Sequence, residues 1–122
     1  MPLSSADQIW NRAAMDGGGP NPNQGDIELS ALLLLHGLVM NGGVEHAMEC
    51  LSTNEFASAE AGFRYFGFTE LASILHSARQ TKECDLELLD QRYWEQIPSD
   101  DTIVKAYERH FYNSPESYTP LQ

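Results

Sequence analysis

Basic side chains are scarce in this chain. Seven Lys and Arg residues stand against 18 Asp and Glu residues, which gives a formal net charge of -11. A chain with this balance and no basic patch is repelled by nucleic acid and by anionic membranes, so we expect it to bind neither directly. The charge favours a basic partner protein, although many proteins are acidic simply for solubility.

Cysteines are few, and the uninterrupted apolar runs are short. Cys50 and Cys84 are spaced neither as a disulfide framework nor as a zinc site, so we expect two free, partly buried thiols in a reducing cytosol. The longest apolar run, residues 31–35, is too short to span a membrane. Residues 1–7 show no basic segment leading into an apolar one, so no signal peptide is expected. These features predict a cytoplasmic protein.

The hydrophobic spacing is helical and nowhere shows sustained alternation. With 122 residues and a hydrophobic fraction of 42%, the chain is expected to form an all-α, compact single-domain bundle of six to seven short helices. An N-terminal helix and a Gly/Pro/Asn-rich loop occupy 1–25, and 26–122 form the main helical domain. Helices are predicted to begin near residues 5, 26, 43, 53, 69, 85 and 99. Their expected caps are Ser5 (with Gln8), Asp26, Thr53 or Asn54, Thr69, and Ser99 or Asp100.

A structural corner is predicted at Asn41-Gly42-Gly43, between two of these helices. Asn and Gly tolerate the left-handed conformation that ends a helix, and two glycines let the next helix start close by. We expect a Gly42→Val substitution to damage folding before it damages recognition, because of the backbone conformation required at this position.

Carboxylates recur at helical spacing. Residues four apart on a helix lie ~6 Å apart along its axis, whereas DNA phosphates repeat about every 3.4 Å along each strand, so such a row can imitate alternate phosphates. Glu55 is a further candidate near this row. An ordinary solvated face is the alternative, and acids in the first turn of a helix also favour its dipole. The predicted partner-binding face consists of Glu45, Glu49, Glu83, Glu87, Asp90, Asp100 and Asp101.

Metal binding and catalysis find little support in the sequence. His46 and Cys50 are one helical turn apart with Glu49 beside them, but no third or fourth ligand follows at a suitable spacing. There is no Gly-x-Ser-x-Gly nucleophile elbow, and the acids fall mostly at positions expected to be exposed. We therefore predict no metal, no cofactor and no enzymatic activity, with a small enzyme or metal protein as a third alternative.

Five segments in order resemble a known family. They are Asn-Gly-Gly-Val-Glu at 41–45, Phe-Arg-Tyr-Phe-Gly at 63–67, Glu-Leu-Ala-Ser-Ile-Leu at 70–75, Asp-Gln-Arg-Tyr-Trp at 90–94, and Ala-Tyr at 106–107 before Asn-Ser-Pro at 113–115. Over about residues 27–118 the chain resembles the bacterial family of small acidic helical proteins typified by a DNA mimic. It departs from the family in having Val44, Ala47 and Met48 where aromatic residues are usual. The resemblance also suggests a structural role for Asp90.

The resemblance implies binding rather than catalysis. One branch of the family imitates double-stranded DNA and occupies a transcription regulator, and other members resemble immunity proteins that sit beside toxins. Our first hypothesis is a non-enzymatic acidic protein that blocks a basic surface on a nucleic-acid-binding regulator, a nuclease or a toxin. The alternative is an immunity protein with a compact, partly apolar and salt-tolerant interface to one toxin. The sequence leaves a homodimer open.

Overall fold

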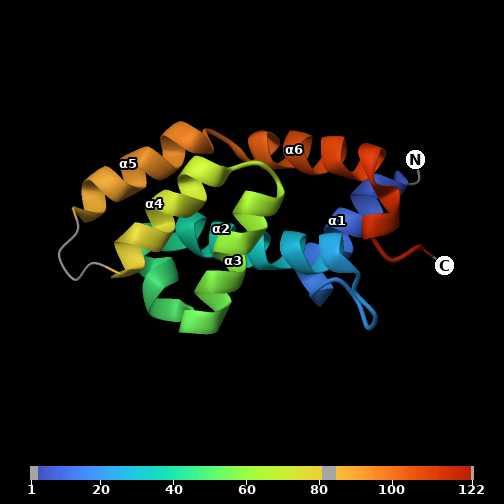
Figure 1. The fold of residues 1–122 in the computed structure, drawn as a ribbon, viewed down its shortest axis with the longest axis horizontal. Helices are drawn as coiled ribbons and strands as arrows, with labels where there is room; N and C mark the ends of the chain where they lie inside the picture. Colours follow the sequence, from blue (N-terminus) through green and yellow to red (C-terminus); the bar gives the residue numbers. More distant parts are fainter. Residues whose placement is uncertain (1–2, 81–84, 122) are drawn as a thin grey trace.

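The fold is all-α, as predicted. The computed structural model describes residues 3–80 and 85–121, so Glu83 and Cys84 lie outside the described residues. The described residues form six α-helices and one short 3-10 turn, with no strand among them (Figure 1). The elements are α1 (Ser5–Asp16), α2 (Gln24–Cys50), α3 (Thr53–Tyr65), α4 (Thr69–Gln80), α5 (Leu86–Gln96), α6 (Asp100–Asn113) and η1 (Pro115–Ser117).

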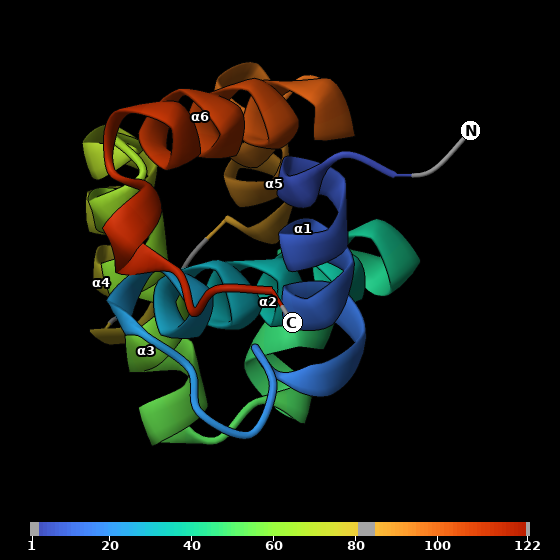
Figure 2. The same cartoon turned by 90° about the vertical axis from the view of Figure 1, so that its right-hand side faces the viewer.

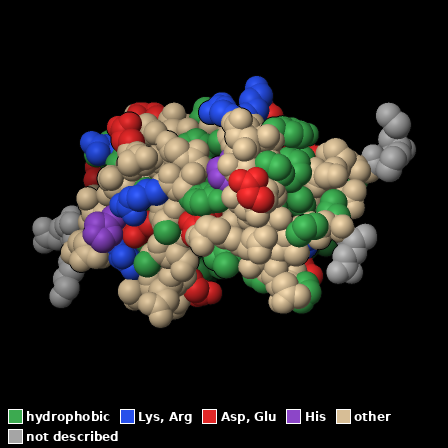
Figure 3. All heavy atoms as spheres, turned by 45° about the vertical axis from the view of Figure 1, so that its right-hand side comes forward, with side chains coloured by type: hydrophobic (Ala, Val, Ile, Leu, Met, Phe, Trp, Pro, Cys, Tyr) green, Lys and Arg blue, Asp and Glu red, His purple; other side chains and the backbone are tan. Residues whose placement is uncertain are grey.

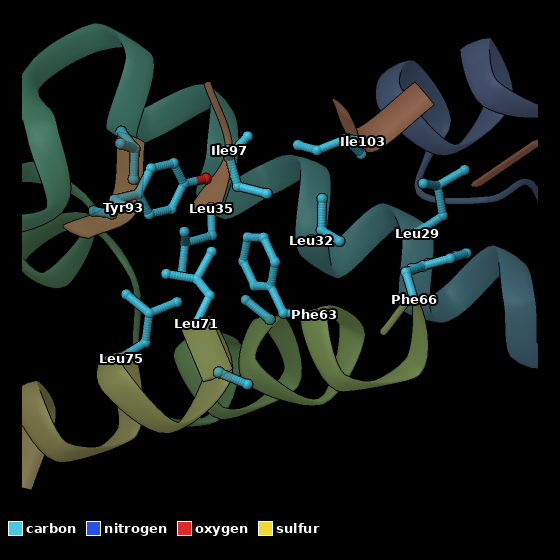
Figure 4. Close-up of a cluster of buried hydrophobic side chains, with 14 of the residues drawn as sticks. Leu29, Leu32, Leu35, Phe63, Phe66, Leu71, Leu75, Tyr93, Ile97 and Ile103 are labelled. Carbon is cyan, nitrogen blue, oxygen red and sulfur yellow. The ribbon is translucent and has the colours of Figure 1, made fainter. Parts of the chain in front are cut away.

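Helix α2 is the centre of the fold. It packs against α1, α3 and α5, and Figure 2 shows it passing between α1 and the pair α3 and α4. Leu29, Leu32 and Leu35 of α2 are fully buried, and Figure 4 shows them facing the aromatic and aliphatic side chains of the neighbouring helices. Among the described residues, α2 is the one helix long and apolar enough by composition to cross a membrane. Its buried stripe against three other helices is the arrangement of a core helix.

The glycine corner is a kink inside α2. The backbone leaves helical geometry at Gly42 (φ -162°, ψ 17°) and at Gly43 (φ 84°, ψ 177°), and helix resumes at Val44. The predicted reason for the importance of Gly42 was wrong, because its φ is extended and open to any residue. The position that demands glycine is Gly43, whose combination of φ and ψ is essentially restricted to that residue. A side chain at Gly42 would instead crowd His46, 2.8 Å from a Cβ atom.

Gly43→Ala is expected to lower the free energy of unfolding by about 1–3 kcal/mol, because alanine is strained at this φ and ψ. Its Cβ would also lie 2.9 Å from the Asp90 carboxylate, and would displace that carboxylate from its hydrogen bond with the Val44 N–H. Urea denaturation measures the change. Gly67→Ala is the matched control, since Gly67 also has a positive φ (93°) but no atom within 4 Å of the new Cβ. A loss no larger at Gly43 than at Gly67 would contradict the crowding.

Three helix caps lie upstream of the predicted residues. The side chain of Ser4, not Ser5, accepts the Asp7 N–H (3.1 Å), and Ser52, not Thr53 or Asn54, accepts the Glu55 N–H (3.1 Å). Each helix begins one residue after the side chain that accepts its free N–H group. Helix α2 is capped by Asn23, with Asp26 as the reciprocal acid of a capping box. Glu55 closes the other box by accepting the Ser52 N–H at 2.9 Å.

Both ends of the described chain meet at Asp26, which is completely buried. Its Oδ1 accepts from the Arg12 guanidinium (2.8 Å), and its Oδ2 accepts the N–H groups of Asn23 (3.0 Å) and Thr119 (2.7 Å). The Arg12 guanidinium also donates to the Thr119 carbonyl at 2.8 Å. We call Arg12, Asp26 and Thr119 the clasp. It joins α1, the start of α2 and the C-terminal segment.

Candidate functional site

The predicted acidic face is divided among three elements. Glu45 and Glu49 are exposed on the last turns of α2, Glu87 is exposed at the start of α5, and two exposed acids open α6. On the side of the molecule seen in Figure 3, acidic and basic side chains are interspersed and form no continuous stripe. The acids are therefore separate groups held by different helices rather than one row.

Three of the predicted acids are unengaged. Within residues 3–80 and 85–121, the side chains of Glu45, Glu49 and Glu87 make no hydrogen bond and no ion pair. A carboxylate without a partner on a solvent-facing helix has both oxygens available to accept hydrogen bonds from an incoming cation. These three residues are hereafter the free carboxylates.

Asp90 has the structural role that the resemblance suggested. Its Oδ1 accepts the N–H of Val44 at 2.8 Å, at the point where helical geometry resumes after the glycine kink. A carboxylate is favoured there because the first N–H groups of a helical segment lack intrahelical partners. Asp90 therefore fixes α5 against the last turns of α2, and in this way positions the free carboxylates on both elements.

Asp100 belongs to a hydrogen-bonded chain that continues into the core. Its Oδ1 lies 2.8 Å from His36 Nε2, and His36 Nδ1 lies 2.7 Å from the Tyr93 hydroxyl. Burial, with the nearby charge of Asp100, raises the pKa of Tyr93, so the phenol stays protonated. This allows Tyr93 to donate to Nδ1 while Nε2–H donates to Asp100. These hydrogen bonds between Asp100, His36 and Tyr93 were not predicted from the sequence.

Sequence spacing contains a signal for the burial of His36. It follows Leu32 by four residues and Leu29 by seven, which places it on the buried face of α2. The spacing gives no sign of its partners, which come from α5 and α6 and are 57 and 64 residues away. The second acid of α6, Asp101, pairs with Lys105 at 3.0 Å in an exposed i,i+4 contact. Such a contact is worth about 0.3–0.5 kcal/mol, so a partner can displace it.

Glu60, an acid that the sequence analysis did not single out, is buried between α3 and α4. Its Oε2 lies 3.4 Å from His76 Nδ1 and 3.4 Å from Arg79 Nη2. Its spacing from Phe56 and Phe63 places it within the apolar stripe of α3, and this is the signal that could have found it. Glu60 therefore belongs to the packing of the two helices and not to the exposed acidic groups.

An open, mainly apolar groove lies between α1 and α2 and ends at the first turn of α6. We call it the α1–α2 groove; its volume is about 610 Å³. Its lining includes Trp10 and Met15 of α1, Leu34, Gly37 and Leu38 of α2, and Asp100 of α6. This groove was not predicted from the sequence, because the spacing of apolar residues does not show which of them another helix covers.

The geometry suits the binding of basic side chains and apolar side chains, rather than of a metal ion. Among the described residues, no three His, Cys, Asp or Glu side chains are grouped closely enough to hold a metal ion. In the His46–Cys50 pair, Sγ lies 3.7 Å from either ring nitrogen. Cys50 is exposed, so the prediction of a partly buried thiol was wrong for this residue. The chemically distinctive surfaces are thus the free carboxylates and the α1–α2 groove.

The comparison with protein families gives one match. A family model described as DMP19-like protein matches residues 22–121 of the 122-residue chain. No curated protein and no solved structure matches the chain. The matched segment takes in α2 to α6 and η1, and therefore both the free carboxylates and Asp90. Because that segment covers most of its length, the chain belongs to the DMP19-like protein family.

Proposed function

We propose that this chain is a non-enzymatic acidic protein that binds and blocks a basic surface of a partner protein, by presenting carboxylates where the partner would bind DNA phosphates. The observation that carries the proposal is the set of free carboxylates, Glu45, Glu49 and Glu87, on a chain of net charge -11. Membership of the DMP19-like family is compatible with DNA mimicry.

The mechanism is electrostatic competition. Glu45 and Glu49 are one helical turn apart, so their carboxylates repeat at ~6 Å along the axis of α2. Asp90 holds α5, which carries Glu87, against these turns. Since the acids are mounted on packed helices, little conformational freedom is lost when they meet a basic surface. The accumulated negative charge accelerates encounter with a basic partner and makes binding sensitive to salt.

The test is capture of the partner from the native cell, followed by titration of the purified pair at low and high salt. Changing Glu45, Glu49 and Glu87 to Lys is expected to weaken binding by about tenfold or more at low salt, because like charges then face the partner. The fold should survive, since these exposed side chains engage no described group.

The matched control changes Asp7, Glu95 and Glu116 to Lys. These residues are exposed on α1, α5 and η1, outside both the free carboxylates and the α1–α2 groove, and the control shifts the net charge from -11 to -5 (three changes of +2), as the test variant does. We expect the control to retain most of the affinity. Equal losses of affinity in both variants would show that net charge alone, and not the position of the free carboxylates, determines binding. An affinity that changes neither with salt nor in either variant would refute the proposal.

One observation favours the second candidate, an immunity protein for a cognate toxin. The α1–α2 groove offers apolar contact area, which a compact and salt-tolerant interface requires. Rescue of cells from a co-expressed neighbouring toxin, with an affinity unchanged in the triple Lys variant, would support this function over electrostatic blocking.

A further inference from the structure

We propose that the α1–α2 groove is the docking site for an amphipathic helix of the basic partner, with apolar side chains seated in the groove and a Lys or Arg paired with Asp100. This inference rests on the proposed function, because it adds the kind of segment by which the basic partner is held. Three features of the groove support it: exposed apolar side chains, an open floor, and charge of one sign.

The groove leaves large apolar side chains in water. Met15 is 85% exposed and Leu34 is 47% exposed, while Leu38 is half-buried beside them. Leu34 and Leu38 are one helical turn apart on α2, and both line the groove. Covering apolar surface is favourable by about 25 cal/mol per Å², so this face gains free energy from an apolar occupant.

The floor of the groove is open at Gly37. This glycine is exposed in the middle of α2, and a Cβ atom added there would meet no atom within 4 Å. A glycine inside a helix is unfavourable by about 1 kcal/mol relative to alanine. Its effect here is to let a visiting side chain approach the backbone of α2. The volume of about 610 Å³ is in the range of preformed binding sites.

The charge at the groove selects a cation. Asp100 stands at one end, with its Oδ1 bonded to His36 and its side chain 60% exposed. Asp16 is exposed between Met15 and Gly17, which both line the groove. Among the described residues, no Lys or Arg lines it. A helix with apolar anchors at i, i+3, i+4 and i+7 and basic residues beside them meets both requirements, in the helix-in-groove mode of recognition.

The groove also lies partly outside the segment that the family model matches. Trp10 and Met15 belong to α1, which precedes residue 22. The site therefore depends on a helix of this chain that is not part of the matched family segment.

The test uses a Leu/Lys peptide of about 14 residues, four helical turns, with Leu at i, i+3, i+4 and i+7 and Lys elsewhere. A scrambled peptide of the same composition is the probe control, because it keeps the charge and removes the apolar face. Isothermal titration with the whole chain is expected to show binding of the amphipathic peptide about tenfold tighter than that of the scrambled one. Equal affinities would overturn the inference.

Protein variants then locate the peptide. Gly37→Leu fills the floor of the groove, and Leu34→Lys places a positive charge there, of the same sign as the Lys residues of the peptide. Each variant is expected to abolish the tenfold preference for the amphipathic peptide. Met40→Lys is the matched control, since Met40 is 55% exposed on the same helix and does not line the groove, so it should keep the preference. Asp100→Asn, which can still accept from His36, is expected to weaken binding of the Lys-containing peptide severalfold. A preference that survives Gly37→Leu would overturn the inference.

Three further outcomes separate this inference from its alternatives. If sedimentation shows a dimer that Leu34→Lys dissociates, a second copy occupies the groove and the inference is overturned. If capture of the native partner is lost in the triple Lys variant but unchanged in Gly37→Leu, the proposed function stands and the groove inference fails. If capture is lost only in Gly37→Leu and Leu34→Lys, the groove is the docking site and electrostatic blocking by the free carboxylates fails.

Discussion

Asp26→Ala is expected to lower the free energy of unfolding by about 3–5 kcal/mol, the range found when one partner of a buried ion pair is removed. Asp26 is fully buried and accepts from Arg12, Asn23 and Thr119. Its loss leaves the largely buried Arg12 guanidinium without its counter-ion and two backbone N–H groups without their acceptor. The substitution therefore affects α1, α2 and the C-terminal segment together.

Urea denaturation followed by circular dichroism measures this loss. Asp16→Ala is the control, because Asp16 is an exposed acid of α1 whose side chain engages no described group; it should change stability by less than about 0.5 kcal/mol. Asp26→Asn tests the charge separately, since the amide keeps the size and one acceptor oxygen. A loss for Asp26→Ala as small as that for Asp16→Ala would show that the clasp does not hold the ends of the fold.

Gly62→Ala is expected to lower the free energy of unfolding by about 1–3 kcal/mol, because the added methyl group overpacks the contact between α3 and α2. Gly62 is the close-approach point of α3 on α2, because a Cβ there would lie 2.5 Å from the Glu28 carbonyl oxygen and 3.3 Å from Leu32. The nearest obstacle is backbone, so no rotation of a side chain can relieve it, and the helices must move apart. The core that α2 and α3 share loses contact as a result.

Gly37→Ala separates packing from helix propensity. Both glycines lie inside helices, so alanine gains about 1 kcal/mol of propensity at either position. Gly37 meets no neighbour within 4 Å, and its variant is expected to be more stable than the parent. Thermal or urea unfolding of the two variants measures the difference. If both changes stabilise the protein, the close approach of α3 to α2 at Gly62 would be refuted.

Helix number could be predicted because hydrophobic periodicity is a local property. The N-cap residues were harder to predict, because Ser4 and Ser5 are adjacent and can both cap a helix, as can Ser52 and Thr53. Which of them caps depends on where the backbone first becomes helical, and packing against other helices decides that. A displacement of one residue is therefore the expected error of local reasoning.

The candidate site was only partly predictable, for a different reason. Exposure of Glu45, Glu49 and Glu87 follows from helical spacing, and the structure places them in solvent. The engagement of Asp90 and Asp100 depends on Val44 and His36, which are 46 and 64 residues away along the chain. No sequence pattern specifies such tertiary pairs, so acids that look equivalent divide into free ones and engaged ones.

The clasp has a consequence for the order of folding. Arg12 meets the Thr119 carbonyl across 107 residues, and the Tyr107 hydroxyl donates to the Ala6 carbonyl across 101. Contacts of such separation are slow to form, because the loop between them must close first. On a ribosome, α1 is synthesised well before residues 107–119, so it can acquire these partners only after they have been made. Until then the side of α1 that these partners cover is open to other chains, so α1 is where we expect aggregation of nascent chains to begin.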